Sequence, residues 1–148
     1  MEFLPEITVH LENKPGRLAK ICSALAKEKV NIRALSVMDG AGPSRLRMIV
    51  DDVDTTRRVL TELGSEYQTT EVLAVDIDHR PGTLARILER LAGEHINIEY
   101  AYVSQTDPAG RVLGIFHTSN SKRARQLLID SASSNGDGRG GRRPLFVR

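Results

Sequence analysis

The chain contains an internal repeat. When Pro15 is aligned with Pro81, a shift of 66 positions, segments 15–38 and 81–104 match without a gap at eleven identical residues. These are Pro15/Pro81, Gly16/Gly82, Leu18/Leu84, Ala19/Ala85, Ile21/Ile87, Leu25/Leu91, Ala26/Ala92, Glu28/Glu94, Asn31/Asn97, Ile32/Ile98 and Val37/Val103. A period of this length indicates two related folded units in tandem, so a binding site is expected twice or between the copies.

The composition is that of an ordinary globular chain. Of its 148 residues 40% are hydrophobic and 27% are charged, and the net charge of +2 is too small to indicate a nucleic-acid or membrane partner. No apolar run has the length of a membrane span, and residues 1–5 lack the pattern of a signal peptide. The single cysteine, Cys22, excludes an internal disulfide and fits a reducing compartment, so we expect a cytoplasmic protein.

The first repeat has the pattern of a βαββα unit. Ile7, Val9 and Leu11 alternate with polar residues, as in a strand with one buried face. After Pro15-Gly16, apolar residues at helical spacing predict a helix. A strand from residue 30, a hairpin loop at 40–43, a strand over 46–50 and a helix follow, the last capped within 51–54 and ended by Gly64.

The second repeat has the same order of elements. We expect a helix over 83–95, a strand over 97–104, a turn at 107–110, a strand over 111–117 and a helix over 121–130. Residues 66–78 precede it and fit either two strands or one long strand that serves both units. Residues 131–141 have no periodicity and should be flexible, whereas 144–147 could dock or pair briefly.

The motifs at the two helix starts resemble those of the ACT domain, a βαββαβ module that senses amino acids and other small metabolites. The sequence E-N-K-P-G-R-L, a helix and V-N-I form the first copy, and D-H-R-P-G-T-L with I-N-I forms the second. The likeness covers about residues 5–130 and extends to stand-alone tandem ACT proteins described as amino-acid binding. It implies an α+β fold of two ferredoxin-like βαββαβ units in tandem, with antiparallel sheets and helices on one face.

The resemblance also implies domain boundaries. The first ACT domain is expected at residues 1–70, the second at 71–130 and a flexible C-terminal tail at 131–148. Such proteins end each unit with a final strand, whereas 131–148 is unpatterned here. We therefore expect that the first unit's sheet, or an open edge of the second unit after residue 130, pairs with another copy in a homodimer.

The chemistry of the two loops favours an amino-acid ligand. Gly16 and Gly82 let backbone amides approach a bound group, and a helix N-terminus attracts a carboxylate. The side chains of Asn13 and Asn31 can accept from an ammonium group and donate to a carboxylate. The resemblance implies the same role for both, because matching asparagines hold the ligand in serine-sensing ACT domains.

The match to serine-sensing domains is incomplete. Leu11 replaces a ligand-binding histidine, and the corresponding second-copy residues are Ile77, His79 and Asn97. The candidate ligand-binding residues are Asn13, Lys14, Gly16, Arg17, Leu18, Asn31 and Ile32 in the first unit, with His79, Arg80, Gly82, Thr83, Leu84, Asn97 and Ile98 in the second. Structural roles remain open for several of them, since Pro-Gly at a helix start, capping asparagines and a solvated His79 are all ordinary features.

These observations favour a non-catalytic regulatory module with an amino-acid effector, a regulated protein partner and no cofactor. No nucleophile with a nearby base and no cofactor loop appears, and the aspartates at 51–54 fit a helix N-terminus better than a metal site. The alternative is an RNA-binding protein, which would use Tyr100 and Tyr102 on a βαββαβ sheet and the Gly/Arg-rich segment 138–143.

Overall fold

The computed structural model describes residues 1–12, 14–39, 42–104 and 106–134, the last four without their side chains. The elements are β1 (Glu2–Leu11), α1 (Arg17–Lys27), β2 (Ile32–Met38), β3 (Ser44–Val50), α2 (Val53–Glu62), β4 (Tyr67–Asp78), α3 (Thr83–Gly93), β5 (Ile98–Val103), β6 (Arg111–Thr118) and α4 (Ser121–Ser134). This order confirms the predicted α+β fold of two ferredoxin-like units.

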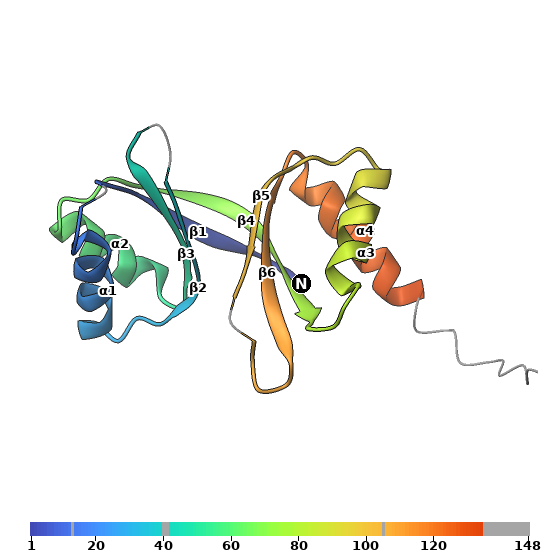
Figure 1. Cartoon of the computed structure of the whole chain (residues 1–148), viewed down its shortest axis with the longest axis horizontal. Coiled ribbons are helices and arrows are strands. Elements are labelled where there is room, and N and C mark those ends of the chain that lie inside the picture. The colour runs from blue at the N-terminus through green and yellow to red at the C-terminus, as the bar shows by residue number, and fades with distance from the viewer. Residues whose placement is uncertain (13, 40–41, 105, 135–148) are drawn as a thin grey trace, which may run out of the picture.

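All the strands join one antiparallel sheet in the order β2-β3-β1-β4-β6-β5. The central strands β1 and β4 pair along most of their length, from Glu2 opposite Ala74 to Val9 opposite Tyr67. In Figure 1 these two strands run between the halves of the molecule, with α1 and α2 at one end and α3 and α4 at the other. The repeat has thus produced two units that share their central strands.

The shared strands complete both units. The first half of β4 lies beside β1 as the final strand of the first unit, so of the two alternatives for residues 66–78, the single long strand that serves both units is the correct one. The start of β1 lies beside residues 72–74 of β4, where the second unit needs its final strand. The expected open edge of the second unit after residue 130 is therefore wrong, because residues 2–4 cover it.

Each helix pair covers its own hydrophobic core. The first core contains Ile7, Val9 and Leu11 of β1 with Ile21 and Leu25 of α1. The second lies under α3 and α4 and includes Leu91, Phe116 and Leu128, with Phe3 of β1 packed against it. The predicted apolar stripes of the helices therefore do face the sheet.

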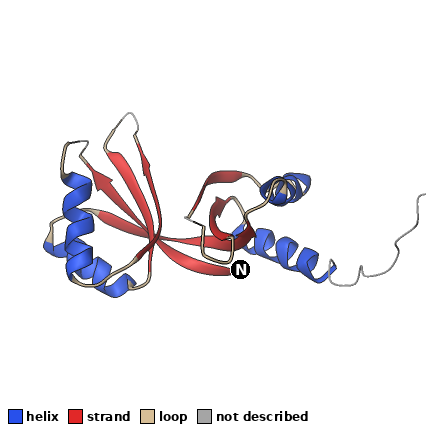
Figure 2. Cartoon of the chain, turned by 60° about the horizontal axis from the view of Figure 1, so that its bottom comes forward, coloured by secondary structure: helices blue, strands red, loops and turns tan. Residues whose placement is uncertain are grey.

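The face of the sheet without helices encloses a third core. β2 and β5 are the two edges of the sheet and yet contact each other, so the sheet must curl with this face inside. Figure 2 shows the strands passing from one helix pair to the other. The enclosed residues are Ala34, Ile49, Val72, Ala74 and Ile115. β1 is consequently buried on both faces, including Glu6 and Thr8, and the prediction of one buried face is wrong.

The ends of α3 and α4 differ from the sequence prediction, and α1 and α3 end in the same way. Lys29 and His95 take left-handed conformations, with φ of 59° and 55°. The N–H of the following residue donates back into the helix, from Val30 to Leu25 O at 3.0 Å and from Ile96 to Leu91 O at 2.9 Å. The left-handed residue that ends each helix is therefore not the usual glycine. Because His95 is left-handed, α3 ends at Gly93 and not at residue 95 as predicted. α4 continues to Ser134, four residues beyond its predicted end.

Gly114 of β6 provides a test of the second core. A Cβ atom there would lie 2.5 Å from Ile77 Cδ1 and 2.8 Å from Phe116 Cε2, both in buried side chains. We expect Gly114→Ala to lower the free energy of unfolding by about 1–3 kcal/mol through overpacking, measured by denaturant titration. Gly93→Ala is the control, since a Cβ meets nothing within 4 Å there and alanine favours the helix. Equal stabilities of the two variants would contradict the packing argument.

Candidate functional site

The two predicted loops have the same backbone geometry. In the first, the N–H of Lys14 donates to Glu12 O at 2.8 Å and the N–H of Arg17 to Lys14 O at 3.3 Å. In the second, the corresponding bonds are Arg80 N–H to Asp78 O at 2.8 Å and Thr83 N–H to Arg80 O at 3.3 Å. Gly16 and Gly82 both have φ of 85°. The repeat therefore extends from the sequence to the conformation of the candidate site.

Glycine is required at these positions for its backbone conformation. A Cβ on Gly16 would meet nothing within 4 Å, so the space beside it is open. A left-handed φ strains any residue with a side chain, which explains the glycine without a ligand. The same geometry leaves room for a ligand to approach the backbone.

The helices that follow these loops begin without a side-chain cap. Gly16 and Gly82 are the N-cap residues of α1 and α3, and neither helix start has a side-chain capping hydrogen bond. In contrast, Asp52 caps α2 by accepting from the N–H of Thr55 at 3.0 Å, as the sequence predicts for 51–54. The first turns of α1 and α3 can therefore offer N–H groups to an external anion.

Charged side chains surround the first loop. The Glu12 carboxylate lies 3.0 Å from Lys14 Nζ and 3.2 Å from Arg17 Nη2. The hydrogen bond from Lys14, followed by the positive charges of Lys14 and Arg17, holds the pKa of Glu12 below its usual value. In the second loop Arg80 lies 3.8 Å from Asp78. An anionic ligand at the first loop would therefore compete with Glu12 for two cations.

The candidate asparagines are held by their backbones. The N–H of Asn31 donates to Asp51 Oδ1 at 2.9 Å, and the N–H of Asp51 donates to Asn31 O at 3.1 Å. Asn97 and Ser119 make the equivalent pair at 3.1 and 2.9 Å. Both asparagines are exposed, so their side chains are accessible to a ligand. Sequence reasoning missed the role of Asp51, because it lies next to the capping Asp52.

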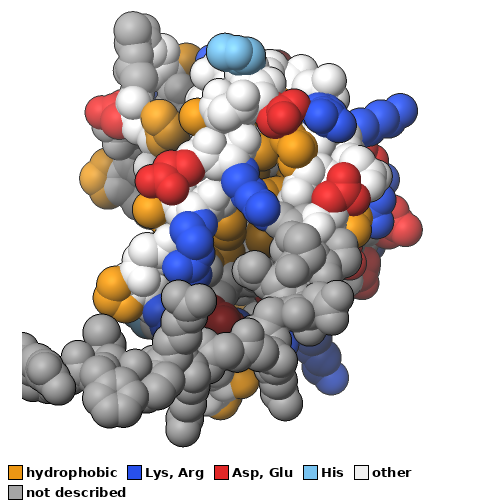
Figure 3. Space-filling view, turned by 90° about the vertical axis from the view of Figure 1, so that its right-hand side faces the viewer, with side chains coloured by type: hydrophobic (Ala, Val, Ile, Leu, Met, Phe, Trp, Pro, Cys, Tyr) orange, Lys and Arg blue, Asp and Glu red, His pale blue; other side chains and the backbone are white. Residues whose placement is uncertain are grey.

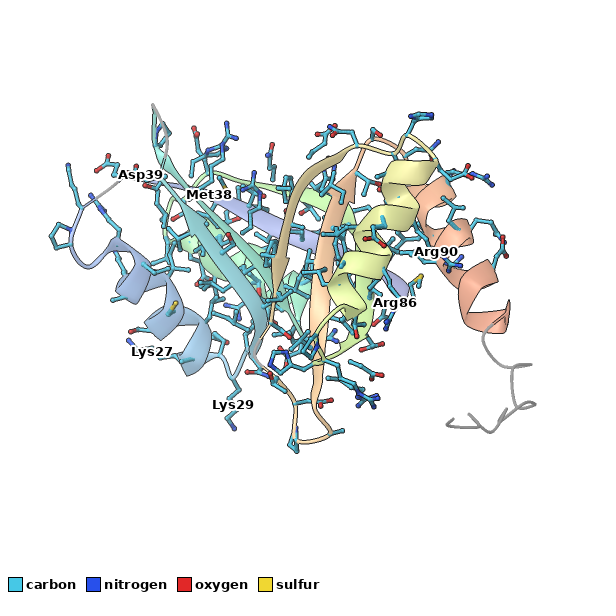
Figure 4. All side chains as sticks on the ribbon, turned by 45° about the vertical axis from the view of Figure 1, so that its right-hand side comes forward. Lys27, Lys29, Met38, Asp39, Arg86 and Arg90 are labelled. Atoms are coloured by element: carbon cyan, nitrogen blue, oxygen red, sulfur yellow. The ribbon has the colours of Figure 1, made fainter. Side chains whose placement is uncertain are left out.

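One unit does not bring all its candidate residues together. The loop around Lys14 precedes α1 and Asn31 follows it, and a helix of 11 residues separates the two by about 16 Å. In Figure 4, Lys27 and Lys29 lie at the C-terminal end of α1, which is the end that Asn31 follows. Asn13 lies outside the described residues. The loop and the asparagine of one unit are therefore too far apart to hold one amino acid.

The remaining candidates flank the cores. Leu18 and Ile32 pack against the first core and Ile98 against the second. Leu84 is 41% exposed on α3. His79 donates its backbone N–H to Gly110 O at 2.9 Å, which joins the second loop to the β5–β6 turn. These positions fit a structural role as well as a ligand contact.

A buried polar cluster lies on the helix-free face. Glu6 is fully buried, and its carboxylate accepts from the hydroxyls of Tyr100 and Tyr102, each at 2.7 Å. Burial, and then the hydrogen bond to Glu6, raises the pKa of both tyrosines above the usual value. The guanidinium of Arg47 lies 3.9 Å from the centre of the Tyr100 ring, and His117 stacks on the same ring.

This cluster removes the main support for RNA binding through the sheet. The tyrosines that were to stack bases are half-buried on the inner side of the curled sheet and donate to Glu6, and Tyr102 packs against the third core. Figure 3 shows acidic and basic side chains interspersed over the visible face of the second half. The Gly/Arg-rich segment 138–143 lies outside the described residues.

Within the described part of the chain, no group of three or more His, Cys, Asp and Glu side chains is arranged to hold a metal ion. The described helices also include none with the length and apolar character of a membrane span.

Comparison with known proteins identifies the family. Residues 3–135 match the model of the ACT domain pair. The chain belongs to the ACT domain family. This match confirms the resemblance drawn from the two Pro-Gly motifs. The comparison with curated protein sequences found no match.

Solved structures share the fold of this ACT domain pair. Protein BT0572 from Bacteroides thetaiotaomicron is 29% identical with a TM-score of 0.80, over 88% of this chain and 89% of that chain. The structure of the aspartokinase alpha and beta subunits has 21% sequence identity and a TM-score of 0.60, over 89% of this chain and 96% of that chain. The regulatory subunit of aspartate kinase from Thermus thermophilus has 17% sequence identity and a TM-score of 0.60, over 88% of this chain and 97% of that chain. The latter two similarities concern the fold alone.

The conformational role of Gly16 can be measured directly. We expect Gly16→Ala to lower the free energy of unfolding by about 1–2 kcal/mol, because alanine must take a left-handed φ. Gly42→Ala is the control, since Gly42 also has open space around its Cβ position but no left-handed φ. Chemical denaturation of both variants measures the difference. Two equally stable variants would show that φ at residue 16 costs nothing.

Proposed function

We propose that this ACT domain pair is a non-catalytic regulatory module that binds a small amino acid at interfaces between ACT units. The observation that carries the proposal is the duplicated loop, with a left-handed glycine and an uncapped helix start in each unit. The module needs no cofactor, acts in the cytoplasm and transmits the bound state to a regulated protein partner through a shift in packing.

The separation along α1 supports a site between two units. The loop before α1 supplies N–H groups for a carboxylate, and Asn31 at the other end supplies amide and carbonyl groups. Two units placed side by side in antiparallel orientation bring the loop of one to the asparagine of the other. Each such interface then contains two equivalent sites, as symmetry requires.

The exposed edge of the first unit supports assembly through β2. Although β2 contacts β5 of the same chain, Leu35, Val37 and Met38 remain 38%, 44% and 52% exposed on this edge strand. An edge strand with apolar side chains is a ready partner for a second copy. Pairing of two β2 strands would cover these residues and place the two α1 helices beside each other, in a homodimer.

The solved relatives give a precedent for regulation by this fold. One of them is a regulatory subunit of aspartate kinase, which has the same fold over 88% of this chain. Its identity of 17% supports the architecture and leaves the effector and the partner of this chain to experiment.

The ligand prediction is tested in two steps. A thermal-shift screen of the amino acids identifies the effector, because a ligand of the native state raises the melting temperature. Asn31→Ala should then weaken binding by about 1–3 kcal/mol in calorimetric titration, the cost of an unpaired polar group. The fold should persist, since the bonds between Asn31 and Asp51 use the asparagine backbone.

Gln126→Ala is the matched control for this titration, as it removes an exposed amide from α4, far along the chain from both loops. Asn97→Ala tests the second unit in the same way. If Asn31→Ala and Asn97→Ala both fold and bind like the parent, the asparagines belong to the scaffold and the proposed site is refuted.

The assembly prediction concerns β2. Light scattering should give the mass of a dimer, and Val37→Lys should shift it toward a monomer because a charge on an edge strand opposes pairing. Val103→Lys, on the edge strand β5 where Val103 is 51% exposed, is the matched variant. A monomeric parent, with and without the effector, would exclude the homodimer, and loss of the dimer only in Val103→Lys would assign it to β5.

A further inference from the structure

The helix-free face contains a polar cavity that the loop sites do not use. It has a volume of about 410 Å³ and lies between β3 of the first unit and β5 and β6 of the second. A second cavity of about 460 Å³ adjoins it toward the β2–β3 hairpin and shares Met38, Arg45 and Arg47 with it. Each volume is within the range of small-molecule pockets.

Arg47 has unused hydrogen-bonding capacity beside this cavity. Its side chain is nine-tenths buried, and its Nε has no hydrogen-bond partner among the described residues. Nη1 donates to Met38 Sδ at 3.4 Å, which is a weak acceptor. The nearest carboxylate, that of Glu6, is 3.8 Å from Nε and already accepts from two tyrosines.

A second arginine lines both cavities with Arg47. Arg45 precedes it by two residues on β3, so both side chains lie on the same face, about 7 Å apart along the strand. Arg45 is exposed and makes no ion pair with a described residue. Thr8, Gln68 and Thr70 add hydroxyl and amide groups from β1 and β4. The walls therefore offer two planar groups of N–H donors and several neutral polar groups.

The acidic residues of the cavity limit the charge of a ligand. Glu99 lines it from β5, with its Oε2 atom 3.5 Å from His117 Nδ1, and Asp39 lines the adjoining cavity. A second negative group on the ligand would be repelled by these carboxylates. A ligand with a single planar carboxylate suits the donors, since guanidinium groups bind carboxylates bidentately. It also carries no second negative group for the acidic residues to repel.

We propose that this cavity binds a small monocarboxylate, with Arg45 and Arg47 as its hydrogen-bond donors. The bound carboxylate lies beside Arg45 and the guanidinium of Arg47 and contacts both units, since Arg45 and Arg47 belong to the first and Tyr100 and His117 to the second. This site is independent of the loops at Gly16 and Gly82.

The test uses the full chain and nuclear magnetic resonance titration, which detects millimolar binding. Propionate is the probe, propionamide is its neutral isostere and inorganic phosphate is the competing anion. We expect propionate to give saturable shifts of the amide signals of Thr8, Gln68 and Thr70, and propionamide to give none. Phosphate should bind at least about tenfold more weakly than propionate because of Glu99.

Two variants and a control locate the binding. Arg45→Gln should weaken propionate binding at least about tenfold, and Arg47→Lys should do the same because lysine keeps the charge but loses the planar donor group. Arg33→Gln is the matched control, since Arg33 is an exposed arginine of β2 that lines neither cavity, and it should bind like the parent.

Three results would overturn the proposal. The first is propionamide shifting the same signals as strongly as propionate, and the second is phosphate binding more tightly than propionate. The third is unchanged propionate affinity in folded Arg45→Gln. Because Arg45 is exposed, that variant should fold even if Arg47→Lys does not, and the test remains decisive.

Discussion

The pairing of β1 with β4 is the interaction on which the rest of the structure depends. Each strand belongs to both units, so the ladder from Glu2–Ala74 to Val9–Tyr67 supplies the final strand of the first unit and of the second at once. A ferredoxin-like unit that lacks this strand leaves its first strand as an open edge. Neither unit is therefore complete without the other, and residues 2–5 are an integral part of the second unit's sheet.

Glu6 shows how this shared ladder fixes the curl of the sheet. It lies on β1 at the seam, and its tyrosine partners are 94 and 96 residues away in the second unit, while Arg47 approaches from the first. A buried carboxylate is costly unless its oxygens accept hydrogen bonds, and here both do. The cluster thus favours the one arrangement of the halves in which both tyrosines reach Glu6.

Much of the fold was predictable because local patterns and the repeat agree. The apolar stripe of α1 follows from periodicity alone, whereas periodicity left open whether residues 66–78 form one strand or two. The burial of the second face of β1 could not be predicted in this way, because Glu6 and Thr8 on that face are polar residues whose partners lie far away in the sequence. The left-handed Lys29 and His95 escaped detection for a similar reason, since neither is the glycine usual at a helix end.

For the candidate site, the sequence predicted the positions of the two loops but not all of the contacts around them. Spacing identified Gly16 and Gly82, and both have the left-handed conformation that suits a loop before a helix. The predicted helix also places Asn31 at the far end of α1 from Lys14, because each helical residue adds 1.5 Å. The sequence did not indicate that Asp51 holds the backbone of Asn31, because the two residues lie 20 positions apart. The sequence likewise contained Arg45 and Arg47 two residues apart without indicating that a curled sheet would enclose one of them.

Both proposed sites join two units, and this has a consequence for regulation. A ligand changes a conformational equilibrium only if it binds one arrangement more tightly than another. The affinity for an amino acid held between the loop of one unit and the asparagine of another depends on the distance between the units. The same holds for the affinity for a carboxylate held between β3 and β5. A ligand confined to one rigid unit would have no such dependence. The division of each site between units is therefore what would allow binding energy to alter the packing that a partner protein detects.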